Sequence, residues 1–165
     1  GFSNACNDAI DYAMECFDFN CLCLLNSDTE IVTKNWFDIV ESRFISNEKT
    51  GVAGVVSDNA MYQTIENVDQ YLNKLKEKPT LNTNLIHGFC FFINKNLINV
   101  IGRFDDDMFP HYGSEDDYSL KSIKYGFTHA PGAINTLATA LEPVKEPEWI
   151  LISLIFITTL VEALA

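Results

Sequence analysis

Three short apolar runs constrain the fold of this chain more than any other feature of its sequence. They lie at residues 19–25, 52–56 and 89–93, and polar or turn-forming residues bound each of them. Nearly continuous apolar runs of this length are typical of strands buried on both faces of a sheet. Segments with helical spacing of apolar residues alternate with them, at about residues 4–17, 33–44, 65–78, 97–101 and 114–125. The alternation predicts an α/β sheet with crossover connections.

The ends of the helices are predicted from residues with strong capping preferences. Ser3 or Asn4 is expected to begin the first helix. Ser114 is expected to cap the last one, with Asp117 three residues later completing a variant of the capping box. Gly126 follows that helix and is expected to end it, as Gly102 is expected to end the short helix at 97–101.

The charge balance excludes some classes of partner. The chain carries 11 Lys and Arg against 23 Asp and Glu, a formal net charge of -12. Nucleic acid and anionic membrane surfaces recruit basic residues, so neither is expected as a partner. An acidic protein that binds a phosphorylated ligand needs another source of positive charge, and a divalent metal ion is the economical one.

The cysteines indicate a reducing compartment. There are five, an odd number, which does not suggest a disulfide framework. Cys21 and Cys23 are predicted to share one face of a strand as buried thiols, since no second Cys or His pair at suitable spacing completes a zinc site. The chain opens without the basic start and apolar run of a signal peptide, and we expect a cytoplasmic protein.

A polar turn follows the first apolar run and brings two hard-oxygen side chains to the end of a strand. Asn26 and Asp28, two positions apart, are ligand types that suit Mg²⁺ or Mn²⁺. In open α/β sheets, ligands bind outside such strand ends. The alternative is a plain turn between strand and helix, because Asn, Ser and Asp are common turn formers.

A second acidic cluster lies at the start of the last predicted helix. Glu115, Asp116 and Asp117 all fall in its first turn, where carboxylates complement the helix dipole. Three carboxylates in one turn are more than helix capping requires. The loop before them carries His111 and Tyr112, which could contact a sugar, and an ionised carboxylate in such a turn could take a proton from an acceptor.

A third candidate is His87 followed by Gly88, at the entrance to the run at 89–93. A glycine there lets a ligand approach the backbone. His87 alone is more often a structural histidine than a ligand.

Together these motifs resemble the large inverting family of nucleotide-sugar glycosyltransferases, glycosyltransferase family 2, which has the GT-A fold. The resemblance lies in their order along the chain, at residues 1–7, 24–29, 36, 54–59, 88–93, 101–105 and 112–121. It covers about residues 1–127. It implies a GT-A-type, Rossmann-like mixed sheet flanked by helices, whose first nucleotide-binding strands would precede residue 1.

The same resemblance implies roles for individual residues. Asp28, with Asn26, would hold Mn²⁺ or Mg²⁺ against the donor diphosphate, as a variant of the DxD motif. Asp116 would be the general base, and Glu115 would orient it or contact the acceptor. The other implied residues are Asn7 and Ser27 for the donor, and His87, Gly88, His111 and Tyr112 for the acceptor.

The predicted function is metal-assisted transfer of a hexose from a nucleotide sugar, with inversion, as in polysaccharide biosynthesis. The acceptor would be a carbohydrate, a lipid-linked or a protein hydroxyl. One alternative is a non-catalytic carbohydrate- or partner-binding remnant of the same fold. Another is a calcium-binding module on the acidic residues 105–107 and 115–117, which lack the EF-hand spacing.

Residues 131–165 stand apart from the predicted glycosyltransferase domain at 1–130. Residues 142–148 resemble a linker, and residues 149–161 are thirteen uncharged, mostly apolar residues. A membrane span needs about 20 residues. The run is therefore expected to be a buried element; the alternative is the stub of a membrane segment, which would place the protein at the membrane periphery.

Overall fold

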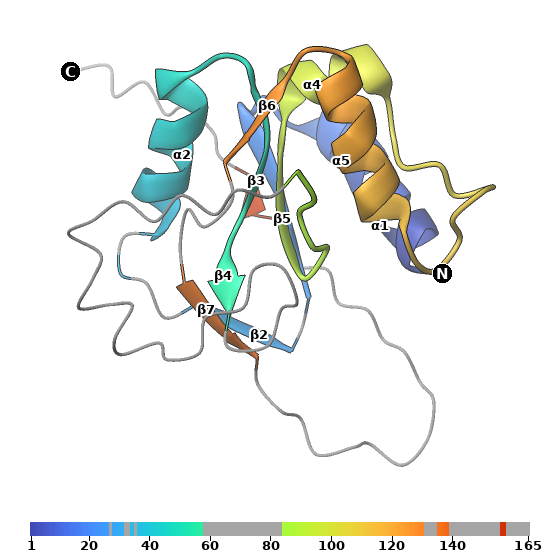
Figure 1. The fold of residues 1–165 in the computed structure, drawn as a ribbon, viewed down its shortest axis with the longest axis horizontal. Helices are drawn as coiled ribbons and strands as arrows, with labels where there is room; N and C mark the ends of the chain where they lie inside the picture. The colour runs from blue at the N-terminus through green and yellow to red at the C-terminus, as the bar shows by residue number, and fades with distance from the viewer. Residues whose placement is uncertain are drawn as a thin grey trace.

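The structure of the chain is a computed structural model that describes residues 1–26, 28–31, 34, 36–57, 84–130, 135–138 and 156–157 (Figure 1). The helix predicted at 65–78, the first residue of the helix predicted at 33–44 and the donor residue predicted at Ser27 lie outside these ranges.

The main sheet of the described part is mixed, with strand order β6-β3-β5-β1-β8. Its strands are β1 (Cys21–Leu25), β3 (Thr50–Gly54), β5 (Cys90–Asn94), β6 (Thr128–Ala130) and β8 (Phe156–Ile157). The central strand β5 runs antiparallel to both β1 and β3, and β3 runs parallel to β6. The prediction that the three apolar runs share one sheet is therefore confirmed.

A smaller sheet lies below the main one in Figure 1, with order β2-β7-β4. Its strands are β2 (Thr29–Ile31), β4 (Val56–Ser57) and β7 (Asn135–Ala138). The single strand predicted at 52–56 is thus wrong in detail, because the chain leaves the main sheet after Gly54 and pairs with β7 from Val56 onward.

Helices cover both faces of the main sheet. They are α1 (Phe2–Cys16), α2 (Trp36–Ser46), α4 (Lys95–Ile101) and α5 (Ser114–Lys124). α1, α4 and α5 contribute to one apolar cluster, and α2 packs into the other. Figure 1 shows α1 and α5 side by side on the face opposite α2.

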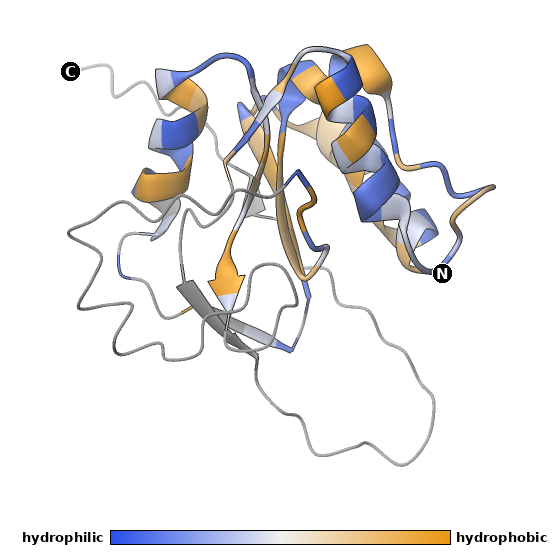
Figure 2. Ribbon diagram, viewed as in Figure 1, coloured by the Kyte–Doolittle hydropathy of each residue, from blue (hydrophilic) through white to orange (hydrophobic). Residues whose placement is uncertain are grey.

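The strands are apolar on both faces because each face has its own helical layer. Along β1, Leu22 and Leu24 belong to the cluster with α1, whereas Cys21 and Cys23 belong to the cluster with α2. β5 alternates in the same way and is coloured as hydrophobic over most of its length in Figure 2. Cys21 and Cys23 are each 2% exposed, so the predicted buried thiols on one strand face are confirmed.

The helix starts differ from the predicted ones. Gly1 precedes α1 and Gly113 precedes α5 at the N-cap positions, and neither helix begins with a capping hydroxyl. Ser3 and Ser114 are instead fully buried inside the first turns. The Ser3 hydroxyl donates to the carbonyl of Phe109 in another segment, so tertiary contact takes the group that local sequence assigned to capping.

The helix ends follow the prediction. Gly102 and Gly126 have φ values of 77° and 85°, a left-handed conformation that glycine adopts without the penalty of a Cβ atom.

The tail after residue 130 contributes strands to both sheets. β7 lies in the small sheet, and β8 extends the main sheet, with Ile157 opposite Leu22 and Phe156 opposite Cys23. Of the apolar run at 149–161, these two β8 residues are the described part, and they form a strand. Among the described residues, no helix has the length and apolar character to cross a membrane.

Candidate functional site

The candidate site lies where the end of β1 meets the start of β5. The two strands are antiparallel, with Leu25 opposite Cys90, so the turn after β1 lies beside the segment before β5. The Asn26 amide donates to the Phe89 carbonyl at 2.8 Å, and the Thr29 hydroxyl donates to the same oxygen at 3.4 Å. These bonds fix the polar turn that carries Asn26 and Asp28 against residues 87–89.

The first turn of α5 reaches the same segment. A Cβ atom added at Gly88 would lie 3.6 Å from Cδ of Glu115 and 2.9 Å from Cζ of Phe2. Glu115 therefore lies directly over the backbone of Gly88, beside the aromatic ring that begins α1. Gly88 is buried, and its missing side chain makes room for these two neighbours as well as for a close backbone approach.

The three carboxylates of α5 differ in their contacts. Asp117 forms an ion pair with Lys121 at 2.6 Å, one helical turn later, and this carboxylate raises the pKa of Lys121. Glu115 lies 3.5 Å from the hydroxyl of Ser114. Oδ1 of Asp116 is buried and has no hydrogen-bond partner among the described residues. A buried carboxylate oxygen without a partner is rare in folded proteins, and a ligand hydroxyl is one group that could supply the missing bond.

A thiol lies close to Glu115 on the α1 side. Cys6 is fully buried, and burial, followed by the nearby charge of Glu115, raises its pKa to about 12. Cys6 is therefore a neutral thiol at physiological pH rather than a nucleophile.

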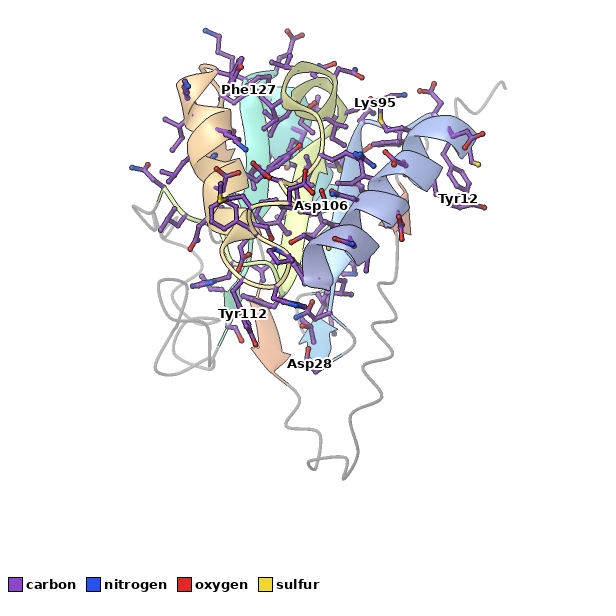
Figure 3. All side chains as sticks on the ribbon, turned by 90° about the vertical axis from the view of Figure 1, so that its right-hand side faces the viewer. Tyr12, Asp28, Lys95, Asp106, Tyr112 and Phe127 are labelled. Carbon is purple, nitrogen blue, oxygen red and sulfur yellow. The ribbon has the colours of Figure 1, made fainter. Side chains whose placement is uncertain are left out.

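The loop before α5 is open to solvent at its tip. Tyr112 is 89% exposed, and His111 is also exposed. Figure 3 shows Tyr112 and Asp28 at the same end of the molecule. His87, which precedes Gly88, is partly buried. The exposed aromatic side chains are thus available to a ligand at this end of the sheet.

Asn7, which the resemblance implies for the donor, is held by contacts within the protein. It is 2% exposed, and its amide group makes two hydrogen bonds to the backbone of Phe104. The structure thus shows Asn7 bonded within the protein.

Lys121 and Ser3 are site-supporting residues that sequence reasoning missed. Lys121 also lies 3.5 Å from Asp105 in the loop of residues 104–113, which we call the acidic loop. Lys121 therefore joins this loop to the first turn of α5. The spacing of Asp117 and Lys121, four positions apart on a helix, was a signal that could have shown one of these contacts.

The residues at the end of β1 are of types that can bind a metal ion together with a substrate. Among the described residues, no three His, Cys, Asp or Glu side chains are grouped to hold a metal. Asn26 is partly buried and Asp28 is exposed, and both offer oxygen atoms at the end of a fixed strand. Mg²⁺ is commonly bound by one or two carboxylates together with substrate phosphates and water, which is the kind of site two protein ligands can form.

No protein-family model and no curated protein sequence matches this chain. Among solved structures, the chain is similar to a mannosyltransferase from Pyrobaculum calidifontis, PcManGT, whose structure contains GDP-Man and Mn²⁺. The TM-score is 0.58 at 14% sequence identity, and the match covers 87% of this chain. The chain spans 38% of the mannosyltransferase's length. The mixed α/β structure described above is therefore a glycosyltransferase-like fold.

Proposed function

We propose that this chain is the part of a GT-A-type inverting glycosyltransferase that binds the metal-diphosphate end of a nucleotide sugar and activates the acceptor. One observation carries the proposal. Two segments that carry oxygen-bearing side chains contact neighbouring residues: the Asn26 backbone amide in the turn after β1 bonds to Phe89, and Glu115 in the first turn of α5 lies over Gly88. The fold similarity to a protein that binds GDP-Man and Mn²⁺ supports this reading.

On the donor side, Asn26 and Asp28 would hold Mn²⁺ or Mg²⁺. The bound ion would stabilise negative charge on the departing nucleoside diphosphate. With a net charge of -12, the chain needs such a positive charge to accept a diphosphate at this edge.

On the acceptor side, Asp116 would act as the general base through Oδ1, which has no partner in the described part of the chain. As the acceptor oxygen bonds to the anomeric carbon, the bond from that carbon to the diphosphate oxygen breaks, and the acceptor proton moves to Asp116. A single displacement of this kind inverts the anomeric centre. Glu115, held over Gly88, would orient the acceptor, and the exposed His111 and Tyr112 would offer it a surface.

The test is a screen of nucleotide sugars, GDP-mannose among them, with Mn²⁺ or with EDTA. Each would be scored by the shift in melting temperature and by release of nucleoside diphosphate with a panel of sugar acceptors. The proposal predicts metal-dependent stabilisation and acceptor-dependent release for at least one donor. Binding without release under every acceptor would favour the non-catalytic alternative, and neither binding nor release would reject the function.

A further inference from the structure

We propose that Asn7 is the positioning residue that holds the acidic loop, and through it the first turn of α5, against the candidate site. The catalytic part of this inference rests on the proposed function. Its structural part, that one buried amide determines where residues 104–116 lie, stands on the contacts alone.

The first contact is a pair of hydrogen bonds between one side chain and one residue of the loop. Nδ2 of Asn7 donates to the Phe104 carbonyl at 3.0 Å, and the Phe104 amide donates to Oδ1 of Asn7 at 2.9 Å. The carboxamide supplies one donor and one acceptor to the same residue, which neither a carboxylate nor an apolar side chain can do. Because Asn7 is 2% exposed, water cannot readily replace either bond.

A second contact lies one helical turn earlier. Ser3, four residues before Asn7 on the same face of α1, donates its hydroxyl to the Phe109 carbonyl. Between these two anchors the loop closes on itself, since the Phe109 amide donates to the Asp105 carbonyl at 2.9 Å. The loop therefore follows α1 toward its N-terminus, and Figure 3 shows Asp106 in the space between α1 and α5.

Phe104 transmits this position to α5. Its ring lies 4.7 Å from the ring of Tyr118, centroid to centroid, and both side chains are buried. The Tyr118 hydroxyl donates to the Gly102 carbonyl at 2.9 Å, so α5 is tied to the start of the loop. Asp116 lies two residues before Tyr118. A shift of Phe104 away from Asn7 would therefore move the turn that carries the proposed base.

The test compares Asn7→Leu with Asn4→Leu in the full chain. Leucine has nearly the shape of asparagine and favours helix, but it leaves the Phe104 amide and carbonyl buried without partners. Asn4 is exposed on the same helix, so its variant controls for the change of residue type. Hydrogen exchange would be measured for the amides of residues 104–118, with transfer kinetics from the donor found in the nucleotide-sugar screen.

For Asn7→Leu we expect exchange at Phe104 about tenfold faster or more, with acceleration spreading to the amide of Asp117, which donates to the Gly113 carbonyl at the start of α5. We also expect a lower kcat with an unchanged donor KM, because the turn that carries Asn26 and Asp28 is bonded to Phe89, which lies outside the loop. Asn4→Leu should leave all of these near their wild-type values. Unchanged exchange at the Asp117 amide, or a lower melting temperature with unchanged kcat, would overturn the positioning role.

Two further readouts keep the result decisive. If Asn7→Leu does not fold, Ser3→Ala replaces it and removes only the hydrogen bond to Phe109. We then expect faster exchange that is confined to residues 105–113. No change in exchange at those residues would reject the proposed anchoring of the loop. If the wild-type protein transfers no sugar, the proposed function fails. The exchange data then decide the structural part separately: acceleration at the Asp117 amide supports it, and its absence overturns it.

Discussion

Replacing Asp116 by asparagine separates the chemistry of the proposed base from its contribution to the fold. Asparagine has the same shape, and no hydrogen bond to Oδ1 is lost, because that atom has no partner among the described residues. The stability cost is then the loss of one negative charge in the first turn of α5, about 0.3–1 kcal/mol. Turnover should fall by roughly two to four orders of magnitude, the contribution of a positioned base. That fall corresponds to about 2.7–5.4 kcal/mol of activation free energy.

Asp117→Asn is the matched control. It removes the same charge from the same turn, together with the ion pair to Lys121, whose two side chains are 22% and 38% exposed. A partly exposed pair at this helical spacing contributes only about 0.3–0.5 kcal/mol. Asp117→Asn should therefore destabilise the protein at least as much as Asp116→Asn while leaving turnover within a few-fold of wild type.

The assay is a paired measurement, on both variants, of the melting temperature and of kcat for nucleoside diphosphate release with acceptor present. For a protein of this size each kcal/mol of stability corresponds to a shift of roughly 2–4 °C, so both variants should melt within a few degrees of the wild type. Near-normal turnover in Asp116→Asn would refute the assignment of the base. Greater loss of turnover in Asp117→Asn would refute it as well and would move the role to that residue.

Three other outcomes are expected. Gly88→Ala should cost little stability, because the added Cβ atom meets mainly the far end of the Phe2 ring. It should nevertheless lower the rate of sugar transfer, because the Cβ atom also presses on Glu115. A variant with wild-type kinetics would show that the site does not use the space over Gly88. In the native protein a thiol reagent should label the exposed Cys16 and not the other four cysteines until urea is added, and labelling of more than one thiol would contradict the burial pattern. Burial lowers the pKa of His129, so the unfolded chain takes up a proton that the folded chain does not, and stability should fall as pH drops below about 6.5. Urea denaturation from pH 7.5 to 5.0 should show a smaller decline in stability for His129→Gln than for the wild type. An equal decline would mean that other groups cause the pH dependence.

The strands were predictable from sequence because the pattern of apolar residues in a strand depends directly on which of its faces are buried. A run such as Cys21–Leu25 is apolar at every position only if both of its faces are covered, and the structure covers them with different helices. The glycines at helix ends were predictable for the same kind of reason, since a left-handed residue after a helix is a local requirement.

The contacts that shape the candidate site were not predictable, because their partners are distant in sequence. Ser3 was expected to cap a helix, and no local pattern indicated the bonds of Asn7, yet both residues bond to the loop around residues 104–109. Asn7 and Phe104 are 97 positions apart. A local pattern shows which polar residue is on a helix, but it does not show which backbone group the tertiary fold brings to it. The glycosyltransferase-like fold, in contrast, was indicated by the order of several motifs along the chain, and the structural similarity supports it.

The position of the metal ion tests the proposed function most directly. Crystals of the protein grown with GDP and Mn²⁺, with diffraction data recorded at the manganese absorption edge, would locate the ion independently of any assumed site. The proposed function predicts an anomalous peak in direct contact with the Asp28 carboxylate, on the edge of the sheet where Glu115 lies over Gly88, and loss of that peak in Asp28→Ala. A bound GDP with manganese at residues 105–107 of the acidic loop, or a peak that persists in Asp28→Ala, would contradict it.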